Sequence, residues 1–394
     1  MDAKIFEDVS EARGQKVDVR IVDADAHVNP APAMWAEYLA PQFRDLAPTL
    51  ESDGEFDYVV FEGSRKKMIM LGANAGRGTK DFKGYGKLSD MRLGGWMAPQ
   101  RLEDMDKDGI DTAILHGGGP LGTANFDLYI ESFAAYNRWV SDFSSHDKNR
   151  LKFVGYIPML DVDLAIKMMR EAHAAGATAV NIPAFPQSKA VFNKAEAQAQ
   201  ALTGDATGSR QYRDAEFDPF WKAACDLDMP ICFHLGARAP RFFAQENILP
   251  DMPLNRIAML EMAGVMLFGG VFDRFPSLRI GLIESGIGWM SWAVHFHNRS
   301  WEMQRHWIGP KNVHRPSDYW EKNIYCSFVS DPVGVELRNH LGCKNIMWSS
   351  DYPHGETTFP HSQQVIADEL AGVPAAERHW ILAGCADKFY GISK

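Results

Sequence analysis

The sequence predicts an α/β protein whose strands close into a (β/α)8 barrel. Short runs rich in β-branched and aromatic residues alternate with segments of helical period, and eight such strand-like runs follow one another along the chain. Because parallel neighbours need a crossover connection, this alternation implies a parallel sheet, and eight repeats suit a closed barrel better than an open sheet. In addition, ionisable side chains follow several of the runs, at the barrel end where active sites gather.

The predicted strands are short, apolar and bounded by polar residues or glycine. They cover residues 19–28, 112–116, 152–157, 178–182, 230–235, 279–284, 324–328 and 346–351. Helical periodicity predicts the helices between them. These cover residues 99–108, 128–146, 163–175, 219–226, 255–272, 288–305 and 333–341, and a C-terminal pair begins at residues 363 and 375.

Residues 1–394 are predicted to form a single domain, because no stretch is dense enough in proline, glycine or serine to act as a linker. Two long insertions interrupt the alternation, at about residues 30–97 and 184–217. The first contains hairpin-like segments at residues 56–61 and 67–71 and a glycine-rich run at residues 72–86. Loops of this length often serve function, and both insertions are expected over the C-terminal mouth of the barrel.

Composition and charge argue against several classes of partner and location. The net charge of -10 and the lack of a basic stripe argue against a nucleic-acid partner. Residues 1–16 are polar and acidic, unlike a signal peptide, and Glu261 interrupts the longest apolar stretch, so we expect a cytoplasmic protein without a membrane partner. The five cysteines are widely spread and form no CxxC pair, which predicts reduced core residues.

The first strand carries the strongest chemical signal. Residues two apart on a strand point to the same side, so Asp23, Asp25 and His27 share one face and can present oxygen and nitrogen to one cation. Asp25 lies nearer the strand end than Asp23, so we assign Asp23 a supporting role and Asp25 a ligand role.

Further metal-ligand side chains end the fifth, sixth and eighth strands. His234 ends the fifth, Glu284 the sixth and Asp351 the eighth, and His354 follows three residues later. A carboxylate directly after an apolar strand is costly to bury unless a cation pairs with it. Together with the first strand these residues form a mixed nitrogen and oxygen set that suits zinc, iron or manganese, as one ion or two.

Other histidines and glycines are assigned to packing. The run after His116 contains the spacing Gly-x-Gly-x-x-Gly, but Pro120 lies within it, so a glycine loop is favoured over a dinucleotide site. His295 and His297 are two apart on a predicted helix and therefore point to different sides. The sequence contains no Gly-x-Ser-x-Gly motif, so covalent catalysis by such a serine is not predicted.

Several short motifs are spread over nearly the whole chain. They are Asp25-x-His27 with Pro30, Arg101-Leu-Glu-Asp-Met-Asp, Phe217-Asp-Pro-Phe-Trp, Pro230-x-x-Phe-His234, Phe272-Asp-Arg-Phe-Pro, Glu284-Ser-Gly-x-Gly-Trp289 and Ser350-Asp351-Tyr-Pro-His354. Together they resemble the amidohydrolase-2 branch of the amidohydrolase superfamily. This branch includes aminocarboxymuconate-semialdehyde and resorcylate-type decarboxylases. The resemblance implies a distorted (β/α)8 TIM barrel with a metal in its mouth.

By the same resemblance, Asp25 and His27 fill the first-strand ligand positions, His234 the fifth and Asp351 the eighth. Asn181 and Pro183 stand where some superfamily members carry a carbamylated lysine, so no such bridge is expected. On the sixth strand the decarboxylases carry a catalytic histidine, whereas this chain has Glu284. A glutamate there can act as a general base or bridge two metals. Some proteins that resemble this branch are di-iron or iron/manganese oxygenases, and this chain is compatible with that group.

Metal-assisted hydrolysis is the first functional hypothesis, with Asp351 or Glu284 moving the proton. A small carboxylate or cyclic metabolite is the expected substrate, with Arg238, Trp289 and Tyr352 as candidate binding residues. A dinuclear iron or iron/manganese oxygenase and a metal-dependent non-oxidative decarboxylase remain as alternatives, and a partner subunit without chemistry is disfavoured by the intact ligand set. A homodimer, or a hetero-oligomer with a related subunit, is expected by resemblance.

Overall fold

The computed structural model describes residues 17–117, 119–188, 203–236, 249–340 and 344–392. Eight parallel strands form one sheet in the order of the chain, as the sequence predicts. They are β1 (Val22–Val28), β5 (Thr112–Gly117), β6 (Leu151–Tyr156), β7 (Ala179–Asn181), β8 (Ile231–His234), β9 (Ile280–Ile283), β10 (Ile324–Phe328) and β11 (Ile346–Trp348).

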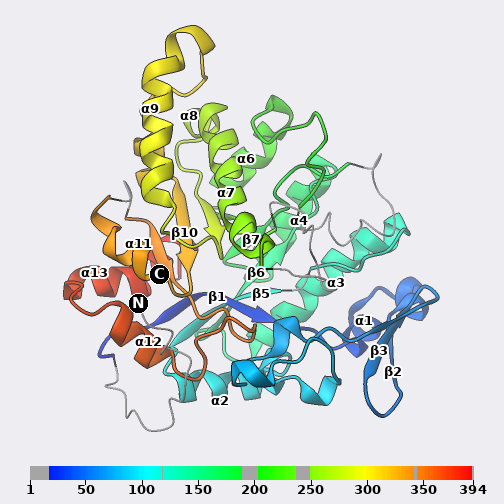
Figure 1. Ribbon diagram of the computed structural model, residues 1–394. Helices are drawn as coiled ribbons and strands as arrows, with labels where there is room; N and C mark the ends of the chain where they lie inside the picture. The colour runs from blue at the N-terminus through cyan, green and yellow to red at the C-terminus, as the bar shows by residue number, and fades with distance from the viewer. Residues whose placement is uncertain (1–16, 118, 189–202, 237–248, 341–343, 393–394) are drawn as a thin grey trace.

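The helices connect the strands, and most of them cover the outside of the sheet (Figure 1). They are α1 (Ala33–Tyr38), α2 (Ala98–Asp108), α3 (Phe126–Ser145), α4 (Val162–Ala174), α6 (Asp218–Asp226), α7 (Asp251–Phe268), α8 (Val271–Arg274), α9 (Met290–Ile308), α10 (Pro316–Lys322), α11 (Pro332–Glu336), α12 (Ser362–Glu369), α13 (Ala375–His379) and α14 (Cys385–Tyr390). The predicted helix at residues 333–341 is only the short α11 with a following turn. Among the helices of the described ranges, none has both the length and the apolar composition needed to cross a membrane.

The first and last strands approach each other and nearly close the barrel. Asp351 donates its backbone N–H to the carbonyl of Asp25 at 3.0 Å, just beyond the end of β11. The Asp23 carboxylate accepts the backbone N–H of Ser350 at 2.8 Å and also its hydroxyl. Asp23 therefore takes the supporting role that the sequence predicts, and the closure places residues after β11 beside the ligands of β1.

The core has two parts, one between helices and sheet and one inside the barrel. Inside the barrel, Phe389 and Tyr390 of α14 pack against side chains of the strands, among them the small Ala24, Ala179 and Cys232. A Cβ atom added to Gly281 would lie 2.7 Å from the Phe389 ring, so glycine is needed there for this close approach. The end of the barrel opposite the predicted metal site is thereby packed by the C-terminal helix.

The insertion at residues 30–97 contains a three-stranded antiparallel sheet beside α1 (Figure 1). Its strands are β2 (Thr49–Ser52), β3 (Asp57–Phe61) and β4 (Ser64–Lys67). The sequence predicts β3 correctly, places β4 about three residues too late and misses β2, whose residues are exposed on both faces and therefore lack an apolar pattern. Farther along, Gly72 packs against His354, so this insertion reaches the candidate site.

No disulfide joins the described cysteines, as the sequence predicts for this part of the chain. Cys232, Cys326 and Cys385 are buried and Cys225 is half-buried, whereas Cys343 lies outside the described residues. His297 packs within the helical layer, where its Nδ1 accepts from the Trp320 indole at 3.3 Å, as expected for a packing histidine.

Candidate metal centre

Strand β1 places its two predicted ligands side by side in the barrel. Asp25 and His27 are 0% and 4% exposed, and Asp25 Oδ1 lies 3.3 Å from His27 Nε2. The i, i+2 spacing explains this proximity, because both side chains leave the same face of the strand. A carboxylate and an imidazole are therefore held together out of water.

The predicted ligands from the other strands converge on this pair. Their ligand atoms form two overlapping groups, and within each group these atoms lie within 4.8 Å of one another. The first group is Asp25, His27, His234 and Glu284, and the second is His27, Glu284, Asp351 and His354. All six residues that the sequence nominates as ligands thus lie at one site.

Several distances define the arrangement. His234 Nε2 lies 3.2 Å from Asp25 Oδ1, and His27 Nε2 lies 3.1 Å from Asp351 Oδ1. His354 Nδ1 lies 2.9 Å from Asp351 Oδ1, and its ring stacks on that of His27 with 3.9 Å between centroids. Asp25 and Asp351 therefore each lie between two imidazoles.

Two of the ligands occupy strained backbone positions. Glu284 and Asp351 have φ values of 60° and 56°, in the left-handed region that usually favours glycine. Such conformations cost roughly 1–3 kcal/mol each and gather at functional sites. The Glu284 backbone N–H donates to Ser327 Oγ at 2.7 Å, which helps to hold the turn after β9.

The imidazoles favour ionised aspartates at this site. Burial opposes ionisation of Asp25, but His234 and His27 outweigh it and hold the pKa of Asp25 well below its usual range. Asp351 follows the same rule, because His354 and His27 overcome burial and lower its pKa to about 2. Burial also disfavours a charged His27, yet Asp25 and Asp351 raise the pKa of His27 well above its usual range.

Glu284 behaves differently from the two aspartates. Burial, and then the negative charges of Asp351 and Asp25, raise the pKa of Glu284 well above its usual range. Of the three carboxyl groups, Glu284 is therefore the one whose surroundings favour the protonated form.

The donor set fits a divalent metal ion. Asp25 Oδ2 is buried and makes no hydrogen bond to any residue that the structure describes, whereas His27 Nε2 and Asp351 Oδ1 lie 3.1 Å apart without the geometry of a hydrogen bond. Buried polar atoms are rarely left without a partner, and buried carboxylates are usually paired or coordinate a metal. Imidazole nitrogens mixed with carboxylate oxygens suit zinc, iron or manganese, and the choice among these metals stays open.

His116 lies at the same site and Asn181 ends the neighbouring strand β7, although the sequence analysis does not count either as a ligand. The His116 ring, at the end of β5, lies with its centroid 5.2 Å from that of His234, and burial lowers the pKa of His116 to about 3. His116 Nδ1 and Asn181 Oδ1 are buried without a hydrogen bond to the described residues. Their positions at strand ends are the signal that could have identified them.

Arg256 is a second functional candidate that the sequence analysis misses. It lies on α7, with Nη2 3.5 Å from Glu284 Oε1 and in an ion pair with Glu356. No motif singles it out, because its helix packs on the site only in the folded chain.

The three predicted substrate-binding residues have different surroundings. Arg238 lies outside the described residues. Trp289 is half-buried and donates its indole N–H to the Ser285 carbonyl at 2.8 Å. Tyr352 is buried, and its hydroxyl donates to Asp104, so its polar end contacts the α2 side of the barrel.

Arg101 links α2 to the first strand of the site. It is buried, donates from Nε to the Gly94 carbonyl at 2.7 Å and from Nη2 to the His27 carbonyl. Its guanidinium lies 4.3 Å from the centroid of the Tyr352 ring. Arg101 therefore holds the backbone of one ligand and packs on the residue that follows another.

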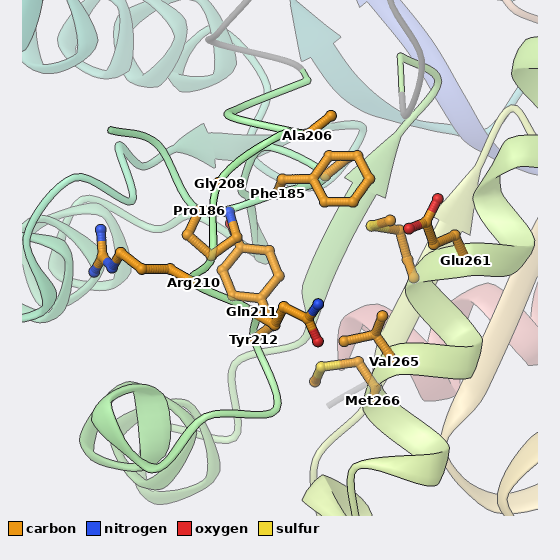
Figure 2. Close-up of a pocket in the computed structure, with 12 residues that line it drawn as sticks. Phe185, Pro186, Ala206, Gly208, Arg210, Gln211, Tyr212, Glu261, Val265 and Met266 are labelled. Atoms are coloured by element: carbon orange, nitrogen blue, oxygen red, sulfur yellow. The ribbon is translucent and has the colours of Figure 1, made fainter. Parts of the chain in front are cut away.

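A separate cavity lies between the second insertion and α7 (Figure 2). Phe185 and Tyr212 line one side of it, Val265 and Met266 line the other, and Arg210 extends away from α7. None of its lining residues belongs to the two ligand groups. This cavity is therefore distinct from the metal centre.

Comparison with known proteins identifies the family of this chain. The model of the amidohydrolase-2 family, described as amidohydrolase, matches residues 22–392. The chain belongs to this family. The resemblance inferred from the motifs is thus confirmed, and the protein is an enzyme of the amidohydrolase superfamily by family membership.

Two relatives of this amidohydrolase-2 chain are decarboxylases. Decarboxylase orsB of Emericella nidulans is 29% identical over 170 residues, which cover 39% of this chain and 49% of that relative. The match thus spans about half of the length of orsB. Gamma-resorcylate decarboxylase of a Polaromonas species is 22% identical over 269 residues, which cover 64% of this chain and 76% of that relative.

Solved structures share the fold. An amidohydrolase of Mycobacterium avium subsp. paratuberculosis superposes with a TM-score of 0.70 at 19% identity, covering 95% of this chain and 98% of that one. A dihydroxybenzoic acid decarboxylase of Polaromonas, solved with manganese and the inhibitor 2-nitroresorcinol, has a TM-score of 0.60 at 15% identity, with the same coverage.

Proposed function

We propose that this protein is a metal-dependent, non-oxidative decarboxylase of a small carboxylic acid, with a hydroxylated aromatic acid as the first candidate. The observation that carries the proposal is the convergence of Asp25, His27, His234 and Asp351 beside Glu284 at the strand ends. Two relatives by sequence support the proposal, since orsB and gamma-resorcylate decarboxylase are both decarboxylases. They favour decarboxylation over the hydrolysis that the sequence suggests first.

Asp25, His27, His234 and Asp351 would hold the metal ion. Manganese is bound in the solved dihydroxybenzoic acid decarboxylase, and two imidazoles with two carboxylates form a plausible set for such an ion. A divalent cation here would supply positive charge that binds and orients an anionic substrate. Its charge would also offset the repulsion among the carboxylates of the site.

Glu284 is the proposed proton donor. In the reaction the bond between the substrate carbon and its carboxylate breaks, carbon dioxide leaves, and the electron pair on carbon takes a proton. Glu284 is 8% exposed and belongs to both ligand groups, so its carboxyl group lies next to the atoms that would hold the substrate.

A dinuclear oxygenase is the second candidate function. The observation that favours it is the second group, His27, Glu284, Asp351 and His354, which offers a second metal position. In that case Glu284 would bridge two ions instead of donating a proton. The two candidates therefore differ in metal stoichiometry and in the need for dioxygen.

The test uses the full chain loaded with Mn²⁺ and incubated with 2,6-dihydroxybenzoate and 5-carboxyvanillate, the acids named for relatives of the family. Loss of the acid and release of carbon dioxide are measured with and without dioxygen. We expect carbon dioxide release both with and without dioxygen. His234→Ala is expected to abolish this release, and the control His173→Ala, which changes an exposed histidine, is expected to retain it. Turnover that requires dioxygen, or cleavage of an ester or lactone without carbon dioxide release, would contradict it.

The exposed face of α9 supports the predicted association of two copies. Trp292, Phe296, Met303 and Trp307 form an apolar stripe, each between 47% and 76% exposed, on a helix that projects from the barrel (Figure 1). Their spacing is symmetric about the middle of α9, so an antiparallel partner helix would pair Trp292 with Trp307 and Phe296 with Met303. A two-fold dimer requires such self-complementarity. In light scattering, we expect the wild-type chain to be a dimer and Phe296→Glu to be a monomer. A monomeric wild-type chain would contradict this association.

A further inference from the structure

Arg256 bridges two carboxylates from different parts of the chain. Its Nη2 lies 3.5 Å from Glu284 Oε1 and also pairs with Glu356, which follows β11. Its Nη1 donates to the Met252 carbonyl at 3.1 Å, which holds the guanidinium in place. The side chains of Arg256 and Glu356 are 23% and 42% exposed, so the bridge runs from the ligand groups toward solvent.

The charges around this bridge raise a problem for an acidic substrate. The carboxylates of Asp25 and Asp351 would balance the charge of one divalent ion, which leaves no net positive charge at the site for an acidic substrate. Among the described residues, Arg256 is the arginine that the ion pairs connect to the ligand groups. A guanidinium presents several N–H donors in a plane and binds carboxylates through paired hydrogen bonds.

We propose that Arg256 binds a carboxylate of the substrate, and that Glu356 occupies the same position on Arg256 until the substrate displaces it. The inference rests on the proposed function, because it takes the substrate to be an acid. Exchange of one carboxylate for another leaves the charge on Arg256 balanced. Glu356 is more exposed than Arg256, and exposed ion pairs contribute little to stability, so its release to water is inexpensive.

A purely structural role for the same ion pair makes a different prediction. If Arg256 and Glu356 only hold the loop after β11 against α7, loss of either residue weakens every ligand alike. If Arg256 recognises the acid, its loss affects acids alone, and loss of Glu356 improves their binding. Comparison of a charged ligand with a neutral one therefore separates the two roles.

The experiment measures binding by calorimetry to the Mn²⁺-loaded full chain. The ligands are 2,6-dihydroxybenzoate and its neutral amide, and the variants are Arg256→Gln, Glu356→Gln and the control Arg274→Gln. Arg274 pairs with Asp218 at 2.9 Å, with similar exposure, and neither residue belongs to the ligand groups. Thermal unfolding of each variant verifies that it is folded.

Arg256→Gln is expected to weaken binding of the acid by about tenfold or more, since a charge-assisted pair is lost, and to leave the amide within about twofold. Glu356→Gln is expected to tighten binding of the acid severalfold, and Arg274→Gln to change neither ligand. Three results would overturn the inference. Arg256→Gln could weaken binding of the acid and the amide equally, Glu356→Gln could leave binding of the acid unchanged or weaker, or the acid could fail to bind to the wild type. If the acid binds through Arg256 and releases no carbon dioxide, the assignment of Arg256 stands and the decarboxylase proposal fails.

Discussion

Replacing Arg101 with methionine tests whether α2 holds the first-strand ligands in place. Methionine has a similar length but no donors, so the change removes the hydrogen bonds to the Gly94 and His27 carbonyls and the contact with the Tyr352 ring. Both carbonyls then lack the donor that Arg101 supplies. The backbone of His27 also loses its connection to α2.

The magnitude follows from these contacts. Each hydrogen bond from a charged donor contributes about 1.5–3 kcal/mol, and the contact with a desolvated ring adds about 2 kcal/mol. Burial lowers the pKa of Arg101, which reflects the cost of placing its charge inside the protein, and removal of that charge offsets part of the loss. We expect Arg101→Met to lower the free energy of unfolding by about 3–5 kcal/mol.

The assay is urea unfolding followed by circular dichroism, with Mn²⁺ binding measured on the folded variant. Arg150→Met is the matched control, because Arg150 also donates to two carbonyls, at 3.2 and 3.0 Å, but is 28% exposed, so water can replace it. The control is expected to lose about 1 kcal/mol or less. We also expect Arg101→Met to weaken Mn²⁺ binding by about 10- to 100-fold, as for other residues that orient ligands. Equal losses in both variants, or unchanged Mn²⁺ affinity in Arg101→Met, would refute the reasoning.

Three further predictions concern the site and its surroundings. Glu284→Gln is expected to keep one metal ion and to lower kcat by about 10²- to 10⁴-fold, because an amide replaces the carboxyl group that donates the proton. Loss of the metal ion in this variant would instead identify Glu284 as a ligand. His354→Ala is expected to leave one ion per chain in a mononuclear site, and metal analysis that finds two ions falling to one would support the dinuclear alternative. Burial raises the pKa of Glu369 to about 7, from 4.5, so the folded chain holds more protons than the unfolded one and its stability falls between these pH values as the pH rises. Glu369→Gln is expected to flatten this part of the stability profile, and an unchanged slope would contradict that origin.

The sequence predicts the eight strands and all six ligand candidates because local patterns encode both. Buried parallel strands are largely apolar runs, and the candidate ligands are the ionisable residues near or shortly after their ends. The chain direction within a parallel barrel then places these ends together without knowledge of any contact.

Other features of the site depend on contacts between distant segments and could not be predicted in this way. Arg256 reaches Glu284 only because α7 packs over the end of β9, and Tyr352 bonds to Asp104 across the closure of the barrel. The left-handed conformations of Glu284 and Asp351 have no sequence signal, since neither residue is glycine. The filling of the barrel by Phe389 is also invisible, because an apolar helix reads alike whether it packs outside the sheet or inside it.

The metal content of the purified chain tests the central claim most directly. After dialysis against Mn²⁺ and removal of free metal, elemental analysis is expected to find one ion per wild-type chain and none in His234→Ala or Asp25→Ala. A wild-type chain without metal, or variants with the wild-type content, would contradict a metal centre built from these strand ends.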